Sequence, residues 1–336
     1  MNYAASGERV ELLDSRISTR VRPAIIRNII GNRLQVFVDK KSSGRSKAGE
    51  EEEDSQIVEG IWLDENSPLI FHIGWAINVG YELKADKTYK EHCEKIVKAL
   101  RTGFSEVPFE TKDAKPSQFA NNHYGFQNSY DNKDVWKIGM KLEVLDPLDT
   151  WKELRVATVL KIMDEGFLKI AKDDAQAISL GIPIGFDGHE IDEDAIPIHS
   201  SSPLLFPVGY AEKYGIPLKG PAVDGNSFNW ISYIQQTQSI AAPESLFHAV
   251  PDENLMKNNF KIGAKLEAVD MCEPYLICVA TVAGHKGRLL QIRYDGWDSS
   301  YDQLFDYRSN NIYPLGWCEI NGYKLEAPNA SINAKK

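Results

Sequence analysis

The sequence predicts a mainly β protein made of three tandem repeats of domain size, each a small β-barrel preceded by a partly helical arm. Three observations lead to this expectation. One motif occurs three times, the apolar runs inside each copy are short and β-branched, and the segments between copies have helical spacing. A chain of 336 residues is long enough for two or three such domains.

The repeated motif opens each copy. "FKIGAKLEAVDMCEPYLICVATV" around Lys265 matches "WKIGMKLEVLDPLDTWKELRVATV" around Lys141. A weaker copy, "SGERVELLDSRISTRVRPAIIRNIIGNRLQVFV", has Gly7, Glu11 and Asp14 in the places of Gly139, Glu143 and Asp146 and of Gly263, Glu267 and Asp270. The closing signatures are "SPLIFHIGWAINVGYELKA", "SPLLFPVGYAEKYGIPLKG" and "NIYPLGWCEINGYKLEAP". The motif recurs about every 110–135 residues, so we place the repeats at 1–85, 86–221 and 222–330.

Within a copy, runs such as "LICVATVAG" and "RLLQIRYDG" predict consecutive strands joined by tight turns, which a small barrel would close. Between copies, Tyr89, Cys93, Ile96, Val97 and Leu100 share one face of a helix. "FNWISYIQQTQSIAAPESLF" also begins as a helix, with a break or a new start at Pro243.

Two other segments depart from this plan. Residues 40–58, rich in Ser, Lys and Glu, are expected to form a disordered acidic loop, with a charged docking segment as the alternative. The segment 109–136 carries Phe119, Tyr124, Phe126 and Tyr130, and we expect these rings to pin an ordered arm to a barrel.

The formal net charge of −10 argues against a protein that wraps duplex nucleic acid and favours a basic partner. The four cysteines, Cys93, Cys272, Cys278 and Cys318, form no CxxC pair, which indicates a reducing compartment. No apolar run approaches the length of a membrane span, and the first residues lack the apolar core of a signal peptide.

The combination of "GAKLEAVD", "VATV", "YDGWDSSYDQLFD" and "YPLGWCE", preceded by "FNW" and "AAPESLF", resembles the malignant brain tumor (MBT) repeat family of chromatin proteins. The third repeat matches along its length, the second at both ends, and the first more loosely, without most of its upstream arm. The resemblance implies a Tudor-like barrel core in each repeat and a compact, propeller-like assembly. It also implies binding of mono- or dimethylated lysine on histone tails, in the nucleus and in transcriptional repression.

Methyl-lysine recognition has clear chemical requirements. A methylated ammonium keeps its charge but gains apolar surface, so aromatic faces bind it through cation–π contacts worth roughly 0.5–2 kcal/mol each. Mono- and dimethyl-lysine keep an N–H that a carboxylate can accept, whereas trimethyl-lysine has none. A narrow aromatic cage with one acid therefore selects the lower methylation states.

Carried over from the family, the cage rings are Tyr294, Trp297 and Tyr301, the carboxylate is Asp270, and the wall is Leu276 and Cys278. Glu273 stands where family members with an active pocket often have Asn. It would either strengthen the attraction for a cation or point to solvent, so the methylation-state preference stays open. Tyr294 replaces a Phe that is common in the family.

The other two repeats lack these rings. The second has "LKIAKDDAQAISLGIPIGFDGHEIDEDAI" and the first "QVFVDKKSSGRSKAG" in the corresponding place. We expect them to be structural or to bind other repressor proteins. Trp75, Tyr210 and Trp317 recur in the closing signatures and are assigned to the core.

An enzyme is not expected. The seven histidines form no HExxH pair, and no GxSxG, GxxxxGK or GxGxxG motif indicates a nucleophile or a phosphate site. "FDGHEIDED" fits a solvated loop better than a metal site, and no cofactor is expected. A non-catalytic scaffold that binds no methyl-lysine is the alternative to a reader. Neither membrane binding nor sequence-specific nucleic-acid binding is expected.

Overall fold

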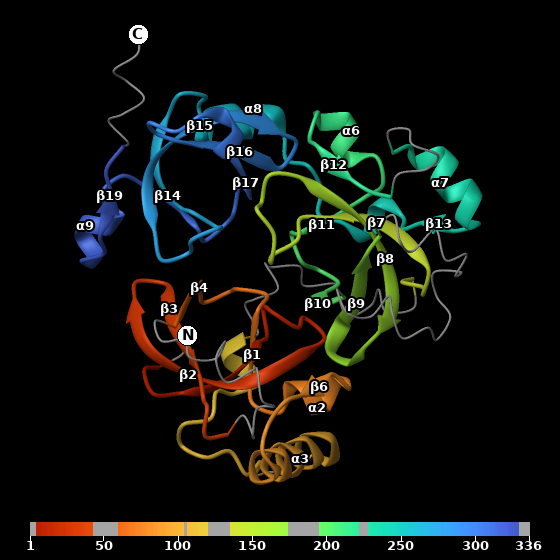
Figure 1. Ribbon diagram of the computed structural model, residues 1–336, viewed down its shortest axis with the longest axis vertical. Helices are drawn as coiled ribbons and strands as arrows, with labels where there is room; N and C mark the ends of the chain where they lie inside the picture. Colours follow the sequence, from red (N-terminus) through yellow and green to blue (C-terminus); the bar gives the residue numbers. More distant parts are fainter. Residues whose placement is uncertain are drawn as a thin grey trace. The chain divides into compact units, whose positions relative to one another are not determined.

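The computed structural model describes residues 5–42, 60–103, 106–119, 135–173, 195–221 and 228–328, and it confirms a mainly β architecture with one sheet for each repeat (Figure 1). "FDGHEIDED" lies outside the described residues, as do nearly all of the loop 40–58 and three of the four rings expected in the segment 109–136. By internal contacts the chain divides into two compact parts. One joins Met1–Tyr130, Lys161–Lys169 and His189–His199, and the other joins Asp131–Leu160, Ile170–Gly188 and Ser200–Lys336.

The elements recur in the same order in each repeat. The first repeat has β1 (Arg9–Leu13), β2 (Arg20–Ile30), β3 (Arg33–Val38), β4 (Ile61–Asp64), β5 (Ile70–Phe71), α2 (Trp75–Val79) and β6 (Glu82–Leu83). The second has α3 (Lys87–Thr102), α4 (Pro116–Phe119), β7 (Met140–Val144), β8 (Leu154–Ile162), η2 (Asp164–Gly166), β9 (Phe167–Lys172), β10 (Ile196–His199), β11 (Leu205–Phe206), α6 (Tyr210–Tyr214) and β12 (Leu218–Lys219). The third has α7 (Trp230–Thr237), β13 (Ile240–Ala241), η3 (Glu244–Leu246), α8 (Glu253–Asn259), β14 (Lys265–Val269), β15 (Ile277–Lys286), β16 (Leu289–Tyr294), η4 (Ser299–Tyr301), β17 (Gln303–Asp306), β18 (Ile312–Tyr313), α9 (Trp317–Asn321) and β19 (Leu325–Glu326).

The three sheets share one topology. Their strand orders are β4-β3-β2-β1-β5, β10-β9-β8-β7-β11 and β17-β16-β15-β14-β18, and a last short strand pairs in parallel with β2, β8 and β15 respectively. In the third sheet, β15 carries an irregularity between Val282 and Gly284 that bends it. The outermost strand β17 then comes back to the end of β14, where the Gln303 amide bonds Asp270 and the Met271 backbone. The third sheet is therefore curled into a barrel, as Figure 1 shows for its blue strands.

Each repeat closes with a five-residue helix that begins at a glycine and is held by a buried glutamate. Gly74, Gly209 and Gly316 have φ of 85°, 87° and 89°, a left-handed conformation that favours glycine. The two backbone N–H groups at the start of each helix donate to one carboxylate, Glu11, Glu143 or Glu267, over 2.6–2.8 Å. This explains why Glu recurs in the opening motif of every repeat.

The closing helices also place the recurring aromatic residue. Trp75 and Tyr210 are buried, as the sequence predicted for the core. Trp317 is only half-buried and stacks on Tyr313 with ring centroids 4.0 Å apart. The core assignment thus holds fully for the first two repeats and in part for the third.

The helical arms follow the predicted pattern. In α3, Tyr89, Cys93, Ile96 and Val97 are buried on one face, and the Asp86 side chain caps the start of the helix by accepting from the Tyr89 backbone. The helix α7 starts likewise at Asn229. After α7 the chain forms the short strand β13, and Pro243 begins the 3-10 turn η3 rather than a second α-helix. Phe119 packs in the first core, as expected.

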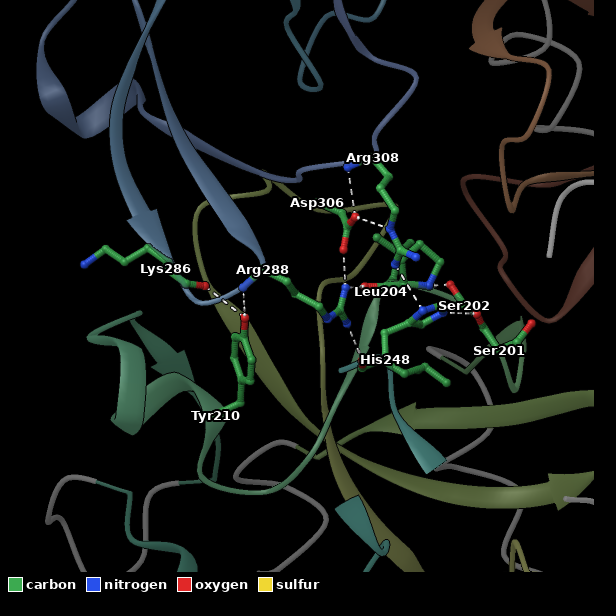
Figure 2. Close-up of polar contacts among 11 residues, drawn as sticks. Ser201, Ser202, Leu204, Tyr210, His248, Lys286, Arg288, Asp306 and Arg308 are labelled. Carbon is green, nitrogen blue, oxygen red and sulfur yellow. Dashed lines mark hydrogen bonds and ion pairs between the residues drawn. The ribbon is translucent and has the colours of Figure 1, made fainter. Parts of the chain in front are cut away.

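A buried arginine joins the second repeat to the third (Figure 2). Arg288, at the tip of the β15–β16 hairpin, bonds Asp306 and also donates to the Pro203 carbonyl over 2.5 Å and to the Leu205 carbonyl over 2.7 Å. Its backbone N–H donates to the hydroxyl of Tyr210 in α6, and that hydroxyl lies 2.9 Å from the Lys286 carbonyl. The charge is thus surrounded by acceptors from both repeats.

His248 lies at the same contact between the second and third repeats. Its Nε2 lies 2.6 Å from the Ser201 carbonyl, and Arg308 lies 3.0 Å from its Nδ1. Burial, together with the positive charges of Arg288 and Arg308, lowers the pKa of His248 to about 4. The imidazole is therefore neutral at physiological pH, with its proton on Nε2.

Two arginine–aspartate pairs of the third sheet give a test of what burial contributes. Arg288→Ala should lower the free energy of unfolding by about 3–5 kcal/mol, because it leaves Asp306 and two carbonyls buried without their donor. Arg293→Ala, whose pair with Asp302 is exposed on the arginine side, should change it by less than about 1 kcal/mol. Denaturant unfolding of both variants measures this, and equal losses would contradict it.

The low pKa of His248 predicts an acid sensitivity. The pKa of this histidine is lower in the folded state than in the unfolded state, so the unfolded state takes up a proton first as the pH falls. The free energy of unfolding therefore decreases as the pH drops from about 6.5 to about 4. His248→Gln, which keeps a donor and an acceptor, should remove about 3 kcal/mol of that fall. Unfolding free energies of both proteins across this window test it, and parallel curves would contradict it.

Candidate functional site

The loop between β16 and β17 carries the three aromatic residues predicted for the cage. Tyr294 is the last residue of β16 and is buried. A turn in which the Trp297 N–H donates to the Tyr294 carbonyl, with Gly296 at φ 82°, brings Trp297 back toward the strand end. The 3-10 turn η4 then ends at Tyr301. The Trp297 and Tyr301 rings lie 5.1 Å apart at 58°, and they are 42 % and 48 % exposed.

Tyr294, unlike this pair, is buried and is held through its hydroxyl. The hydroxyl lies 2.7 Å from the Val269 carbonyl and 2.6 Å from Gln303 Oε1. Burial, followed by the charge of Asp270, raises the pKa of Tyr294 well above its usual value, so the hydroxyl keeps its proton. Gln303 in turn donates to Asp270 Oδ1 over 2.9 Å. The buried amide of Gln303 therefore connects the ring to the predicted carboxylate.

Asp270 lies at the end of β14 with one carboxylate oxygen unused. Oδ1 accepts from Gln303 and from the Cys272 backbone N–H, each over 2.9 Å. Among the residues that the structure describes, no donor reaches Oδ2. The side chain is half-buried, so this oxygen is the natural acceptor for an incoming N–H.

The remaining predicted residues follow Asp270 in the turn and at the start of the next strand, and the Asp270 N–H donates to the Leu276 carbonyl over 3.0 Å. Leu276 and Cys278 are half-buried at the start of β15, and burial, together with the charge of Asp270, raises the pKa of Cys278 to about 12. The Cys278 thiol is thus neutral. Glu273 is exposed, and its carboxylate accepts from the Tyr275 hydroxyl over 2.6 Å.

The aspartate equivalent to Asp270 pairs with a cationic side chain in each of the other two repeats. In the first, Asp14 accepts from Arg20 over 2.9 Å. In the second, Asp146 pairs with Lys172 over 2.9 Å. Asp270 of the third repeat has no such cationic partner among the described residues.

Backbone register shows what takes the place of Tyr294 in the other repeats. The N–H groups of Asp39, Asp173 and Asp295 donate to the Pro23, Val156 and Val279 carbonyls, so these three aspartates are equivalent. The residues just before them are Val38, Lys172 and Tyr294. The lysine that pairs with the aspartate of the second repeat therefore occupies the position equivalent to the cage tyrosine. The first repeat has an aliphatic side chain at that position.

This arrangement suits a cation that carries apolar groups. Two exposed rings offer π faces, a carboxylate oxygen offers an acceptor, and the exposed Asp298 adds negative charge beside the rings. In the described part of the chain no group of three or more His, Cys, Asp or Glu side chains is arranged to hold a metal ion. No described helix is both long and apolar enough to span a membrane.

A lysine of the second repeat lies at this site. Lys152 Nζ is 4.9 Å from the centroid of the Tyr301 ring. Its neighbour Trp151 is buried, packs on Phe305 and accepts from the Leu304 N–H over 2.7 Å, which fixes the loop. Sequence reasoning missed both Lys152 and Gln303. Gln303 follows Tyr301 by two residues, but its role depends on barrel closure, and Lys152 comes from another repeat.

The comparisons agree with this architecture. The family model of the mbt repeat matches residues 8–90, 140–224 and 264–332. The chain is 36 % identical to Protein lin-61 of Caenorhabditis elegans over 330 residues, 96 % of this chain and 50 % of that protein, and 36 % identical to MBT domain-containing protein 1 of Homo sapiens over 322 residues, 95 % and 43 % respectively. It thus spans about half the length, or less, of these relatives.

A solved structure is similar as well. The crystal structure of the four MBT repeats of Drosophila melanogaster Sfmbt, in complex with the peptide RHR(me)KVLR, superposes with a TM-score of 0.74 at 31 % identity, covering 96 % of this chain and 67 % of that one. Three matched segments that cover most of the chain, together with the sheet topology repeated three times, assign this protein to the MBT repeat family.

Proposed function

We propose that this protein is a chromatin reader that binds mono- or dimethylated lysine on histone tails through its third repeat. The observation that carries the proposal is the state of Asp270. Of three equivalent carboxylates it alone lacks a cationic partner among the described residues, and the loop of its repeat presents two exposed rings. The Sfmbt structure, solved with a methylated peptide, supports the same chemistry.

In this proposal each residue has a defined role. Trp297 and Tyr301 contact the methylammonium through their faces, and Tyr294 forms the floor beneath them. Asp270 accepts the remaining N–H of the lysine through Oδ2, while Gln303 holds its other oxygen. Leu276 and Cys278 line the wall. Glu273 contributes charge from the rim rather than a direct contact, because its carboxylate accepts from Tyr275.

The negative charge of the chain favours basic tails by long-range attraction, which salt weakens. Readers of this kind act in the nucleus, in transcriptional repression, and catalyse no reaction. The alternative is a scaffold that joins repressor complexes without binding methyl-lysine. It would leave the two exposed rings without a ligand.

A titration with one basic histone-tail peptide in un-, mono-, di- and trimethylated forms separates the two functions. We expect dissociation constants of about 10–100 μM for the mono- and dimethyl forms, and at least tenfold weaker binding of the other two. Trp297→Ala should weaken binding by about tenfold or more. Asp270→Asn, which keeps the shape but loses the charge, should weaken it by about 10- to 100-fold.

The matched control is Trp62→Ala, which removes a half-buried indole of the first repeat. It should change the dissociation constant by less than about threefold. Equal binding of all four peptides, or none, would support the scaffold.

The lysine beside Tyr301 gives a second test. Lys152→Met keeps the length of the side chain but removes a positive charge near the site, so dimethyl-lysine peptide should bind about two- to fivefold more tightly at low salt. The gain should shrink at high salt, and Lys152→Arg should bind as the unchanged protein does. Weaker binding by the Met variant would show instead that Lys152 supports the ring.

A further inference from the structure

The loop that joins β7 to β8 in the second repeat touches the candidate site at two points. The Thr150 carbonyl lies 3.9 Å from the Sγ atom of Cys272, two residues after Asp270. Lys152 Nζ lies 4.9 Å from the centroid of the Tyr301 ring. The loop therefore reaches both the turn that carries the carboxylate and one of the two exposed rings.

Contacts with the third repeat hold this loop in place. The Trp151 carbonyl accepts from the Leu304 N–H over 2.7 Å, and the buried Trp151 indole lies 5.9 Å from the Phe305 ring between centroids. Since the two residues before Lys152 both contact the third repeat, the backbone of Lys152 is fixed beside Tyr301. The half-buried Lys152 side chain thus keeps its ammonium at the site.

The positive charge of Lys152 is not neutralised within its own loop. The two acids beside it, Asp149 and Glu153, both pair with Arg155, Asp149 by a hydrogen bond of 2.6 Å and Glu153 at 3.9 Å. In the part of the chain that the structure describes, no carboxylate pairs with Lys152. Its ammonium, which has three donors, is therefore available to an anion that approaches the site.

The rest of the border of the site differs in charge from this corner. Arg293, which precedes Tyr294, is already paired with Asp302 over 2.8 Å. Glu273 and Asp298 are exposed acids on the two loops that surround Asp270 and the rings. A peptide bound here would thus meet one available positive charge, at Tyr301, and negative charge on the other sides.

We propose, building on the proposed function, that Lys152 makes the site selective for a methylated lysine that has an anionic side chain one or two residues away. The anion is the carboxylate of Asp or Glu, or the phosphate of a phosphorylated Ser or Thr. An extended peptide advances about 3.2–3.4 Å per residue, so a side chain within two residues of the methyl-lysine can reach the long, flexible stem of Lys152. The two then form a charge-assisted hydrogen bond.

The sign of the contribution of Lys152 depends on this neighbouring residue. The ammonium repels a basic side chain and attracts an anion, and a phosphate, with about −1.5 to −2 charges, more than a carboxylate. An anion elsewhere in the peptide would instead face Glu273 or Asp298 and be repelled. The preference is therefore confined to one side of the methyl-lysine, and that side gives the direction in which the peptide crosses the site.

A charge scan of the ligand tests this inference. The dimethylated tail peptide is made with Glu or with the isosteric Gln at each of the two positions on either side of the lysine, and with phosphoserine or serine at the same positions. At one position, at low salt, Glu should bind about two- to fivefold more tightly than Gln, and phosphoserine about three- to tenfold more tightly than serine. A gain for phosphoserine alone identifies the group as a phosphate.

Variants of the protein show whether Lys152 is the cause. Lys152→Met should remove the preference for the anion, Lys152→Glu should reverse it, and Lys152→Arg should keep it. The matched control is Lys213→Met, because Lys213 also lies over a tyrosine ring, Tyr214 at 5.4 Å, but belongs to α6. This variant changes the net charge equally and should keep the preference.

The outcomes separate this inference from the function on which it rests. Binding that does not depend on methylation in any peptide would overturn the proposed function and the inference together. Methylation-dependent binding in which neither Glu nor phosphoserine is favoured at any of the four positions would overturn the inference alone. A preference that persists in Lys152→Met would do so as well.

Discussion

The buried glutamate of the opening motif is the interaction on which each repeat depends. A helix of five residues has no stability of its own, and most of its N–H groups lack an intrahelical partner. The carboxylate accepts two of them and so ties the closing helix to the first long strand. Burial raises the pKa of Glu11 to about 7 and also raises that of Glu143, which shows how far this group is removed from water. The closing helices that begin with Trp75, Tyr210 and Trp317 are therefore held by this link.

The aspartate of the opening motif, the second acid that all three repeats share, explains why only the third repeat presents a candidate site among the described residues. An aspartate near a strand end is costly to bury unless a cation or several donors compensate it. The first repeat supplies Arg20 and the second supplies Lys172. In the third, neutral donors hold one oxygen of Asp270, and no donor from the described residues reaches the other oxygen. In the second repeat, the position equivalent to the candidate site is thus occupied by the repeat's own lysine.

Much of this could be predicted from sequence, because the information is local. The threefold motif, the short strands and the helical face of α3 follow from spacing alone, and the absence of rings in two repeats follows from the printed residues. The features that could not be predicted depend on how the sheet closes into a barrel. Gln303 reaches Asp270 only because β17 curls back to β14, and nothing local shows that Lys172 pairs with Asp146. Tyr294 was expected as a cage ring, but its burial and the hydrogen bond of its hydroxyl to the Val269 carbonyl also depend on this closure.

The contacts between the second and third repeats place residues of the second repeat beside the candidate site of the third. Trp151 has φ 62°, a strained conformation for a bulky residue that costs roughly 1 kcal/mol or more and persists only where packing enforces it. Its contacts with Leu304 and Phe305 supply that packing, and they place the next residue, Lys152, over Tyr301. The buried Arg288 network resists separation of the two repeats, so the loop cannot move away without exposing that charge. The second repeat therefore sets the charge and the shape at the edge of the site that we propose in the third.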